Sequence, residues 1–251
     1  MRSRITATLA FFFLASTVTA TPALAVCSVA SLKGTYGYFH GRYQGGALLR
    51  AVVGQFTADG LGGLSAGNWT MSTNGAITTG SFVGNYNLAA DCTGVMTFSS
   101  EDLAPANFNI TLDTLHKGLQ MIQIDNGTAQ PGYGVAQGIV VCGVPGKKRI
   151  HASNLQGTLF PSLDIEAFSG KVVFDGAGKI VGTETFSIAG VISIKGLVGT
   201  YTEAADCTGT AQITPDGLTK MNFNAVKVNG GKELLMIETD NNTLIAGTAQ
   251  P

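Results

Sequence analysis

The chain has 251 residues, of which 12% are charged and 45% hydrophobic, and its formal net charge is −1. Proteins that bind nucleic acid neutralise phosphates with clustered lysine and arginine, so this composition leads us to expect no nucleic-acid partner. The chain contains 34 glycines and 7 prolines. That balance is typical of short strands joined by tight turns.

The first residues have the pattern of a secretory signal peptide. Arg2 and Arg4 precede an apolar run, and Ala23–Ala25 forms a small-residue cleavage site. We therefore predict cleavage near Ala25 and export to the periplasm or the extracellular space. The apolar run is shorter than the ~20 residues of a membrane span, and no later segment is long enough, so we expect no membrane span.

The rest of the sequence contains one unit twice. The segment Gly84–Gly94 (GNYNLAADCTG) returns 115 residues later as Gly199–Gly209 (GTYTEAADCTG). The repeated unit is the size of a domain, since the repeats of solenoids span only about 20–50 residues. We predict a signal peptide at residues 1–25, a first domain at residues 26–141 and a second at residues 142–251. Residues present in one copy alone are the better functional candidates.

Four cysteines are divided equally between the two copies. Cys27 and Cys92 are 65 residues apart, and so are Cys142 and Cys207. In an oxidising compartment this spacing favours the disulfides Cys27–Cys92 and Cys142–Cys207 among three possible connectivities. Without a Cys-x-x-Cys motif or a nearby histidine, we expect these thiols to bind no metal.

Turn signals divide each repeat into about eight segments with strand character. In the first copy these segments are Thr35–Tyr43, Leu48–Thr57, Leu64–Ser72, Ile77–Leu88, Val95–Ser99, Asn107–Leu112, Leu119–Ile124 and Tyr133–Val141. No window after the signal peptide has helical period with credible caps. Eight antiparallel strands joined by hairpins favour a closed up-and-down barrel, because closure removes unpaired edges. A pair of β-sandwiches is the alternative.

The first copy opens with Cys27–Tyr36 (CSVASLKGTY), which is loosely similar to the first strand of avidins. Each repeat resembles, in outline, the calycin architecture of lipocalins and avidins, although the lipocalin Gly-x-Trp motif is missing near its start. The resemblance implies an all-β protein with two tandem antiparallel barrels of about eight strands. Barrels of this size are either filled by their own side chains or hold one small ligand.

Aromatic and polar side chains of the first copy are the candidates for a ligand site. We predict that the ligand-binding residues are Tyr36, Tyr38, His40, Arg42, Arg50 and Trp69. The first four alternate along one strand and therefore share one face. Aromatic rings with a few fixed polar groups are what a small-ligand cavity requires.

The second copy lacks these groups in the alignment that its turn motifs suggest. That alignment places Gly157–Pro161 opposite the start of the first copy, Glu166 opposite Arg50 and Thr185 opposite Trp69. The favoured function is accordingly the binding of a small apolar or aromatic ligand by the first barrel, without enzymatic activity.

Two other functions remain open. The protein could be a surface or extracellular interaction protein without a ligand cavity, or a barrel cyclase or isomerase similar to allene oxide cyclases. We assign no catalytic residue, no metal site and no cofactor. His116 falls in a predicted turn and His151 in the predicted linker between the copies. The aspartates of both copies stand beside glycine, threonine or asparagine, where a carboxylate typically caps a turn.

Overall fold

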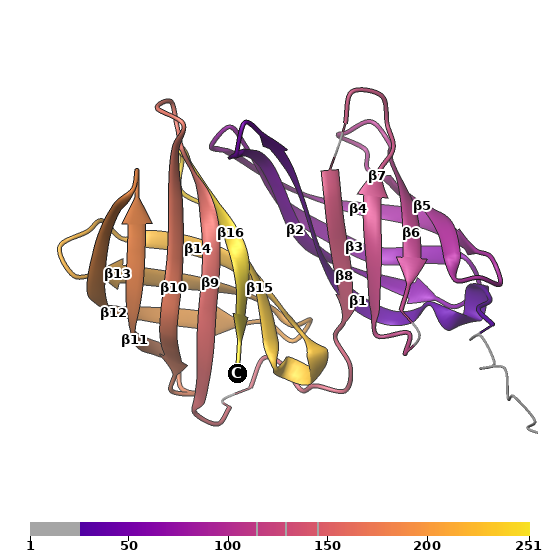
Figure 1. Ribbon diagram of the computed structural model, residues 1–251. Helices are drawn as coiled ribbons and strands as arrows, with labels where there is room; N and C mark the ends of the chain where they lie inside the picture. The colour runs from indigo at the N-terminus through magenta and orange to yellow at the C-terminus, as the bar shows by residue number, and fades with distance from the viewer. Residues whose placement is uncertain (1–25, 114, 129, 145) are drawn as a thin grey trace, which may run out of the picture.

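The computed structural model describes residues 26–113, 115–128, 130–144 and 146–251 (Figure 1). The chain forms two closed barrels in tandem, each of eight strands. Every strand pairs antiparallel with its sequence neighbours, and the last strand of each barrel pairs with the first. The prediction of two tandem all-β barrels is confirmed, and the β-sandwich alternative is wrong. The predicted signal peptide lies outside the described residues.

Barrel 1 contains the short 3-10 helix η1 (Val29–Ser31) and the strands β1 (Lys33–Gln44), β2 (Ala47–Asp59), β3 (Gly63–Thr73), β4 (Ala76–Leu88), β5 (Thr93–Ser99), β6 (Ala106–Leu112), β7 (Gly118–Gln123) and β8 (Gln130–Ala136). The last predicted strand runs too far, to Val141. The observed strand β8 ends at Ala136, because Gly138, with φ 69°, turns the chain out of the barrel. The predicted domain boundary at residues 141 and 142 falls in the connection that follows.

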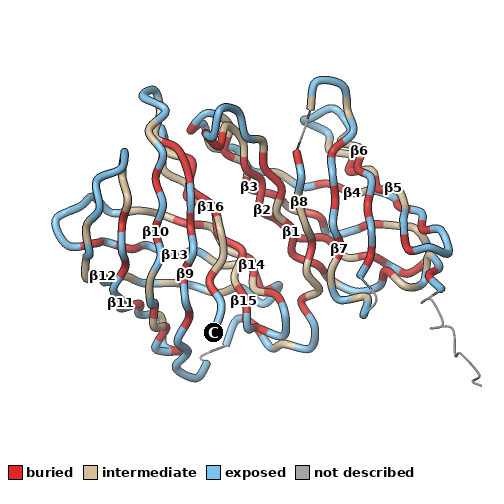
Figure 2. The backbone as a smooth tube through the Cα atoms, in the orientation of Figure 1, coloured by how far each residue is buried: buried red, intermediate tan, exposed pale blue. Residues whose placement is uncertain are grey.

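Barrel 2 contains the strands β9 (Arg149–Leu159), β10 (Asp164–Phe174), β11 (Lys179–Ile188), β12 (Val191–Glu203), β13 (Thr208–Pro215), β14 (Met221–Val228), β15 (Glu233–Glu238) and β16 (Thr243–Gln250), with the 3-10 helix η2 (Asn229–Gly231) between β14 and β15. Side chains alternate between the interior and the outer surface, as the period of two requires. Figure 2 shows this alternation along β10 and β11.

Each barrel has its own apolar core and its own disulfide. Phe56, Phe98 and Phe108 lie in the core of barrel 1, and Phe168 and Phe186 pack inside barrel 2. The predicted disulfides Cys27–Cys92 and Cys142–Cys207 are both confirmed. Each disulfide holds the segment before the first strand of a barrel against the turn between its fourth and fifth strands.

The repeated aspartates cap turns, as predicted. The carboxylate of Asp59 accepts hydrogen bonds from the backbone N–H groups of Leu61 and Gly63. Asp175 accepts the equivalent pair in barrel 2. These bonds lower the pKa of both carboxyls and assign them to the scaffold.

The two barrels pack against each other through a third apolar cluster. Barrel 1 supplies outward residues of β1, β2 and β8, and barrel 2 supplies outward residues of β14, β15 and β16. The buried members include Leu48, Ala51, Val53, Val226, Val228, Leu235, Ile237, Leu244 and Ala246. Figure 2 accordingly shows β2 buried along most of its length, on both of its faces.

Hydrogen bonds cross the same interface. The N–H of Leu48 donates to Thr158 Oγ1 at 2.9 Å, and Asn224 Nδ2 donates to Thr70 Oγ1 at 2.9 Å. An apolar centre with polar contacts around it is the usual composition of a stable interface. The two barrels therefore form one body.

Strand pairing corrects the alignment of the first strands. Tyr36 lies opposite Phe56, and His151 lies opposite Val172, the counterpart of Phe56. The counterpart of Tyr36 is thus His151, not a residue of the segment 157–161. The alignment based on turn motifs was wrong here because the constant spacing of the cysteines, rather than the similarity of short motifs, sets the offset of 115 residues.

A second correction concerns Trp69. It lies opposite Gly54, while Glu184 lies opposite the equivalent Gly170, so Glu184 and not Thr185 is its counterpart. The register of β3 shifts at Ala66, which has φ 49° and is the extra residue of a bulge. A bulge inserts one residue on one strand. The offset between the copies therefore changes from 116 to 115 residues within β3.

Candidate functional site

Four of the six predicted ligand-binding residues line one small cavity in barrel 1. Tyr38, His40, Arg50 and Trp69 surround a space of about 50 Å³. The side chain of Tyr36 points to the other end of the barrel, where its hydroxyl donates to the carbonyl of His116 at 3.0 Å. A space of this size admits water or a group of a few atoms, whereas an apolar cavity that binds benzene measures about 150 Å³. An aromatic ligand would not fit beside these residues.

Burial keeps the imidazole of His40 and the phenol of Tyr38 uncharged near neutral pH. It lowers the pKa of His40 to about 3, with a further contribution from the charge of Arg50. Burial also raises the pKa of Tyr38 above its usual value. Both side chains are therefore neutral and act as hydrogen-bonding groups.

A much larger cavity lies in barrel 2. Its volume is about 290 Å³, close to the lower end of the ~300–1,000 Å³ that is usual for ligand pockets. It opens at the end of the barrel where the Cys142–Cys207 disulfide lies. The apolar part of its lining includes Phe174, Tyr201, Ala211, Ala225, Leu234 and Met236, and the polar part includes Arg149, His151, Glu203 and Lys227.

Smaller side chains explain why this end of barrel 2 is hollow. Barrel 1 has Met96 and Ile110 at the corresponding places, and both are buried in its core. Barrel 2 has Ala211 and Ala225 there. Loss of these apolar side chains leaves space that nothing else in barrel 2 fills, whereas interiors are otherwise close-packed.

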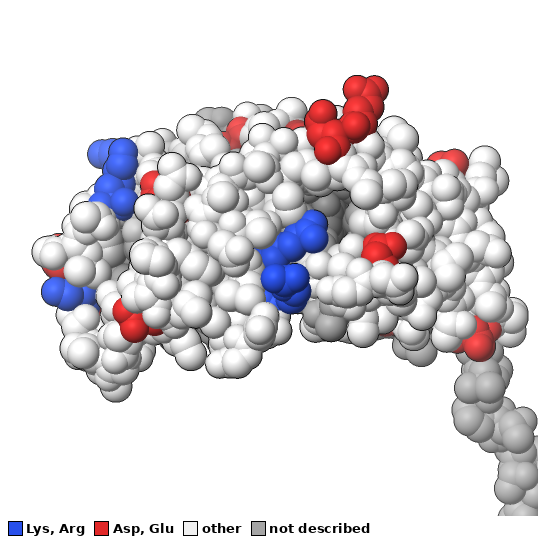
Figure 3. Space-filling view, turned by 90° about the horizontal axis from the view of Figure 1, so that it is seen from above, with Lys and Arg blue, Asp and Glu red and all other residues white. Residues whose placement is uncertain are grey.

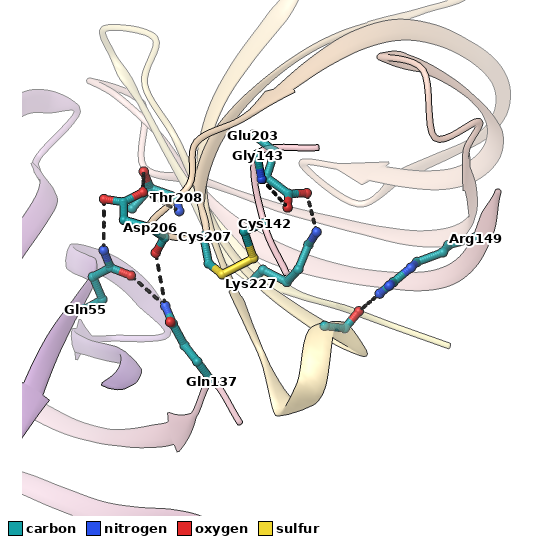
Figure 4. The surroundings of a disulfide bond; sticks show 11 residues. Gln55, Gln137, Cys142, Gly143, Arg149, Glu203, Asp206, Cys207, Thr208 and Lys227 are labelled. Atoms are coloured by element: carbon teal, nitrogen blue, oxygen red, sulfur yellow. Dashed lines mark hydrogen bonds and ion pairs between the residues drawn. A yellow bond between two sulfur atoms is a disulfide. The ribbon is translucent and has the colours of Figure 1, made fainter. Parts of the chain in front are cut away.

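Charged residues replace two further apolar ones at the mouth. Leu88 and Leu112 are buried in barrel 1, and their counterparts are Glu203 and Lys227. These two form an ion pair, and Glu203 also accepts a hydrogen bond from the N–H of Gly143 at 3.2 Å (Figure 4). The pair lies beside the disulfide and is part of the cavity lining.

The two barrels also differ in how this end is covered. In barrel 1 the segment after Cys27 forms η1, and the fully buried Leu32 closes the core. The hydroxyl of Tyr86 fixes this plug by donating to the carbonyl of Leu32 at 2.6 Å. The counterpart of Leu32 is Lys147, which is exposed and lines the cavity mouth. Barrel 2 is therefore open where barrel 1 is plugged.

One polar atom in the cavity wall has no partner. His151 is only 3% exposed, and its Nδ1 atom is buried without a hydrogen bond. Burial lowers the pKa of His151, and the charges of Arg149 and Lys227 lower it further. A neutral imidazole with a free nitrogen in a cavity wall can form a hydrogen bond with a bound molecule.

Sequence reasoning missed this site because it placed His151 in a linker. The residue belongs to β9 and points into the barrel. The equal spacing of the two cysteine pairs was the signal that could have found it, since it aligns His151 with the core residue Tyr36.

Comparison with protein-family models gives no match for this chain, and comparison with the curated proteins gives none either. Its function must therefore be argued from geometry. Across the described ranges there is no helix with the length and apolar character needed to cross a membrane. The same residues contain no group of three or more His, Cys, Asp or Glu side chains arranged to hold a metal ion.

Proposed function

We propose that the protein is an exported, non-enzymatic binding protein for a small molecule with an apolar or aromatic body, and that barrel 2 holds this ligand. The observation that carries the proposal is the cavity of about 290 Å³ at the place where barrel 1 is filled. The two disulfides support an oxidising compartment, in agreement with the signal peptide expected from the sequence.

The lining suggests how the ligand is oriented. The rings of Phe174 and Tyr201 pack edge to face, with their centroids 5.2 Å apart, and form an aromatic wall of the cavity. Such surfaces favour the burial of apolar or aromatic groups. Lys227 and His151 belong to the polar part of the lining and would contact the polar end of the ligand.

The sequence-based prediction placed the ligand in barrel 1. A cavity of about 50 Å³ supports only a much smaller ligand there. Barrel 2 is the better site for a molecule with an aromatic body because its cavity is several times larger.

The test replaces two alanines of the cavity, Ala211 and Ala225, with the residues that barrel 1 has at these places. Ala225→Ile and Ala211→Met should fill the space and weaken binding at least tenfold. The measurements are native mass spectrometry of unreduced protein from its expression host and titration with the fluorescent apolar probe 1-anilinonaphthalene-8-sulfonate. Ala167→Ile is the matched control, because it adds the same atoms to the exposed outer face of β10 in the same barrel.

The reverse substitution tests the same idea from the other side. Met96→Ala combined with Ile110→Ala removes buried volume from barrel 1 and should create a second apolar cavity there, large enough for benzene but not for the larger probe. Unchanged probe binding in Ala225→Ile and Ala211→Met, together with a mass that shows no bound molecule, would contradict the proposal. That result would favour the interaction protein without a cavity.

A further inference from the structure

Two arginines with no acidic partner face each other in barrel 1. Arg42 and Arg50 are directly opposite in the β1–β2 ladder, and both are partly buried. Burial lowers the pKa of Arg50, and the charge of Arg42 lowers it further. Like charges directly opposite each other destabilise a sheet. Within the described ranges, the ion pair Lys227–Glu203 lies in the other barrel, and neither arginine has such a partner.

Unpartnered polar atoms gather at the same end of the barrel. His40 Nδ1, Arg42 Nε, Gln123 Oε1 and Gln130 Oε1 are all buried without a hydrogen bond. Gln123 and Gln130 pair with each other in the β7–β8 ladder, and Gln130 is two residues from Gly132, which lies opposite His40. Buried polar groups are normally satisfied by protein, water or ligand, so this concentration calls for an occupant.

The cavity at this end of the barrel is small and mostly apolar, and of the groups named above only His40 and Arg50 belong to its wall. His40 and Arg50 line the cavity of about 50 Å³ together with Trp69, under the loop that contains Ser100 and Ala104. Figure 3 looks onto this end of the molecule and shows basic side chains beside a hollow in a surface with few charges. The volume limits the occupant to a group of a few heavy atoms.

We propose that the cavity at this end of barrel 1 binds a small carboxylate anion, of the size of formate or acetate, at Arg50 and His40, with Arg42 across the ladder from Arg50. The planar guanidinium group presents parallel N–H donors that match the two oxygens of a carboxylate. The negative charge would offset the repulsion between the two arginines. His40, which is neutral because of its burial, donates its one N–H to a carboxylate oxygen.

Barrel 2 cannot form the same site. Glu166 occupies the position of Arg50, and Gly157, which lies opposite Glu166 in β9, occupies that of Arg42. Burial raises the pKa of Glu166 to about 7, and in either protonation state its side chain lacks the parallel N–H donors of a guanidinium group. The site therefore belongs to barrel 1 alone. It is separate from the ligand cavity, which lies in barrel 2 at the end with the disulfide.

The single tryptophan gives a direct measurement. Trp69 lines the proposed site and is the only tryptophan of the chain, so its fluorescence reports on this cavity. Titration of the wild-type protein with sodium formate or sodium acetate at constant ionic strength should give a saturable change and raise the thermal midpoint. Arg50→Gln and Arg42→Gln should each weaken the response at least tenfold. Glu166→Gln, at the equivalent place in barrel 2, is the matched control and should leave it unchanged.

Three outcomes would overturn the proposal. They are a linear response without saturation, an unchanged response in both arginine variants, and equal saturation by chloride, which lacks the two oxygens of a carboxylate. The test is separate from that of the barrel 2 cavity, because Ala225→Ile should not alter the response of Trp69 to acetate. Either proposal can therefore fail alone.

Discussion

The disulfide ends of the two barrels have the same scaffold and opposite interiors. Both have a cysteine pair, capped turns and eight strands in the same order. In barrel 1, buried side chains such as Leu112 and the plug residue Leu32 fill this end, whereas barrel 2 has the exposed Lys147 and the charged Lys227 at these places. The comparison teaches that one copy of a duplicated barrel can acquire a cavity when small side chains take the place of large buried ones, while the framework stays constant.

The largest expected effect comes from the disulfides. In the chain-entropy model, a loop of 65 residues contributes about 4 kcal/mol. The double variants Cys27→Ala with Cys92→Ala and Cys142→Ala with Cys207→Ala should lose similar amounts in calorimetry. Only the second should change the binding of the apolar probe, because that disulfide borders the cavity. Equal changes in probe binding would show that the ends of the barrels do not differ as described.

The interface between the barrels should give the next largest effect. Leu235 is fully buried in the interface cluster, and its counterpart Gln120 is exposed on barrel 1. Leu235→Ala should lower the free energy of unfolding by about 3 kcal/mol, within the range for large-to-small core substitutions. Gln120→Ala should change it by less than ~0.5 kcal/mol. Urea unfolding of the two variants measures the difference, and similar losses would contradict the assigned interface.

A buried carboxyl distinguishes the other ends of the barrels. Glu238 is 2% exposed, and burial raises its pKa to about 8. Its counterpart is the amide of Gln123, which donates to Asp125 at 2.7 Å. In barrel 2 the residue equivalent to Asp125 is Asp240. Its carboxylate lies near the carboxyl of Glu238 and raises the pKa of Glu238 further.

This difference predicts a dependence on pH. The folded protein retains the proton of Glu238 at pH values where the unfolded chain, with an ordinary pKa near ~4.3, has lost it. Stability should therefore be fully present below about pH 4 and decline as the pH rises through about 8. Glu238→Gln should be about 2 to 5 kcal/mol more stable than wild type at pH 8 and equal to it near pH 4, since each pKa unit corresponds to about 1.4 kcal/mol. Urea unfolding at both pH values checks this, and an equal gain at pH 4 would contradict the titration.

The smallest expected effect is a gain in stability from filling the cavity. Ala225→Ile introduces the side chain that barrel 1 has at this place, and cavity-filling substitutions typically add about 1 kcal/mol. The thermal midpoint of the variant without ligand should rise slightly. A destabilised variant would show that the space is already occupied by protein atoms.

The sequence predicts the fold better than the site, for physical reasons. Alternation of apolar residues and the spacing of Cys27, Cys92, Cys142 and Cys207 are local signals that survive without tertiary information. They correctly give strands, barrels and disulfides. Alternation also indicates that Tyr38 and His40 share a face, and they do line one cavity.

The free volume inside a barrel is not a local property. It depends on residues from several strands, such as Ala211 on β13 and Ala225 on β14, whose small size matters only when both face the same space. The alignment failed near β3 for a similar reason, because the extra residue at Ala66 becomes evident only from the strand register.

The contact between the barrels has a further consequence for the size of the assembly. Of the strands that form the contact, β1 and β2 of barrel 1 and β14 and β15 of barrel 2 are not counterparts of each other, so the two units are joined head to tail. A contact of this kind between similar units can repeat without end and produce a filament. A chain with two such units would be able to add further chains at both of its free faces.

Several residues on those free faces disfavour such growth. In place of Phe39 and Val53, barrel 2 has Asn154 and Ser169, and both are exposed. At the opposite end of the molecule, Thr111 and Gln120 of barrel 1 are exposed at the positions where barrel 2 has the interface residues Val226 and Leu235. The apolar contact inside the chain therefore has no equally apolar equivalent at the free faces, where exposed polar residues stand beside a few exposed isoleucines such as Ile122 and Ile165.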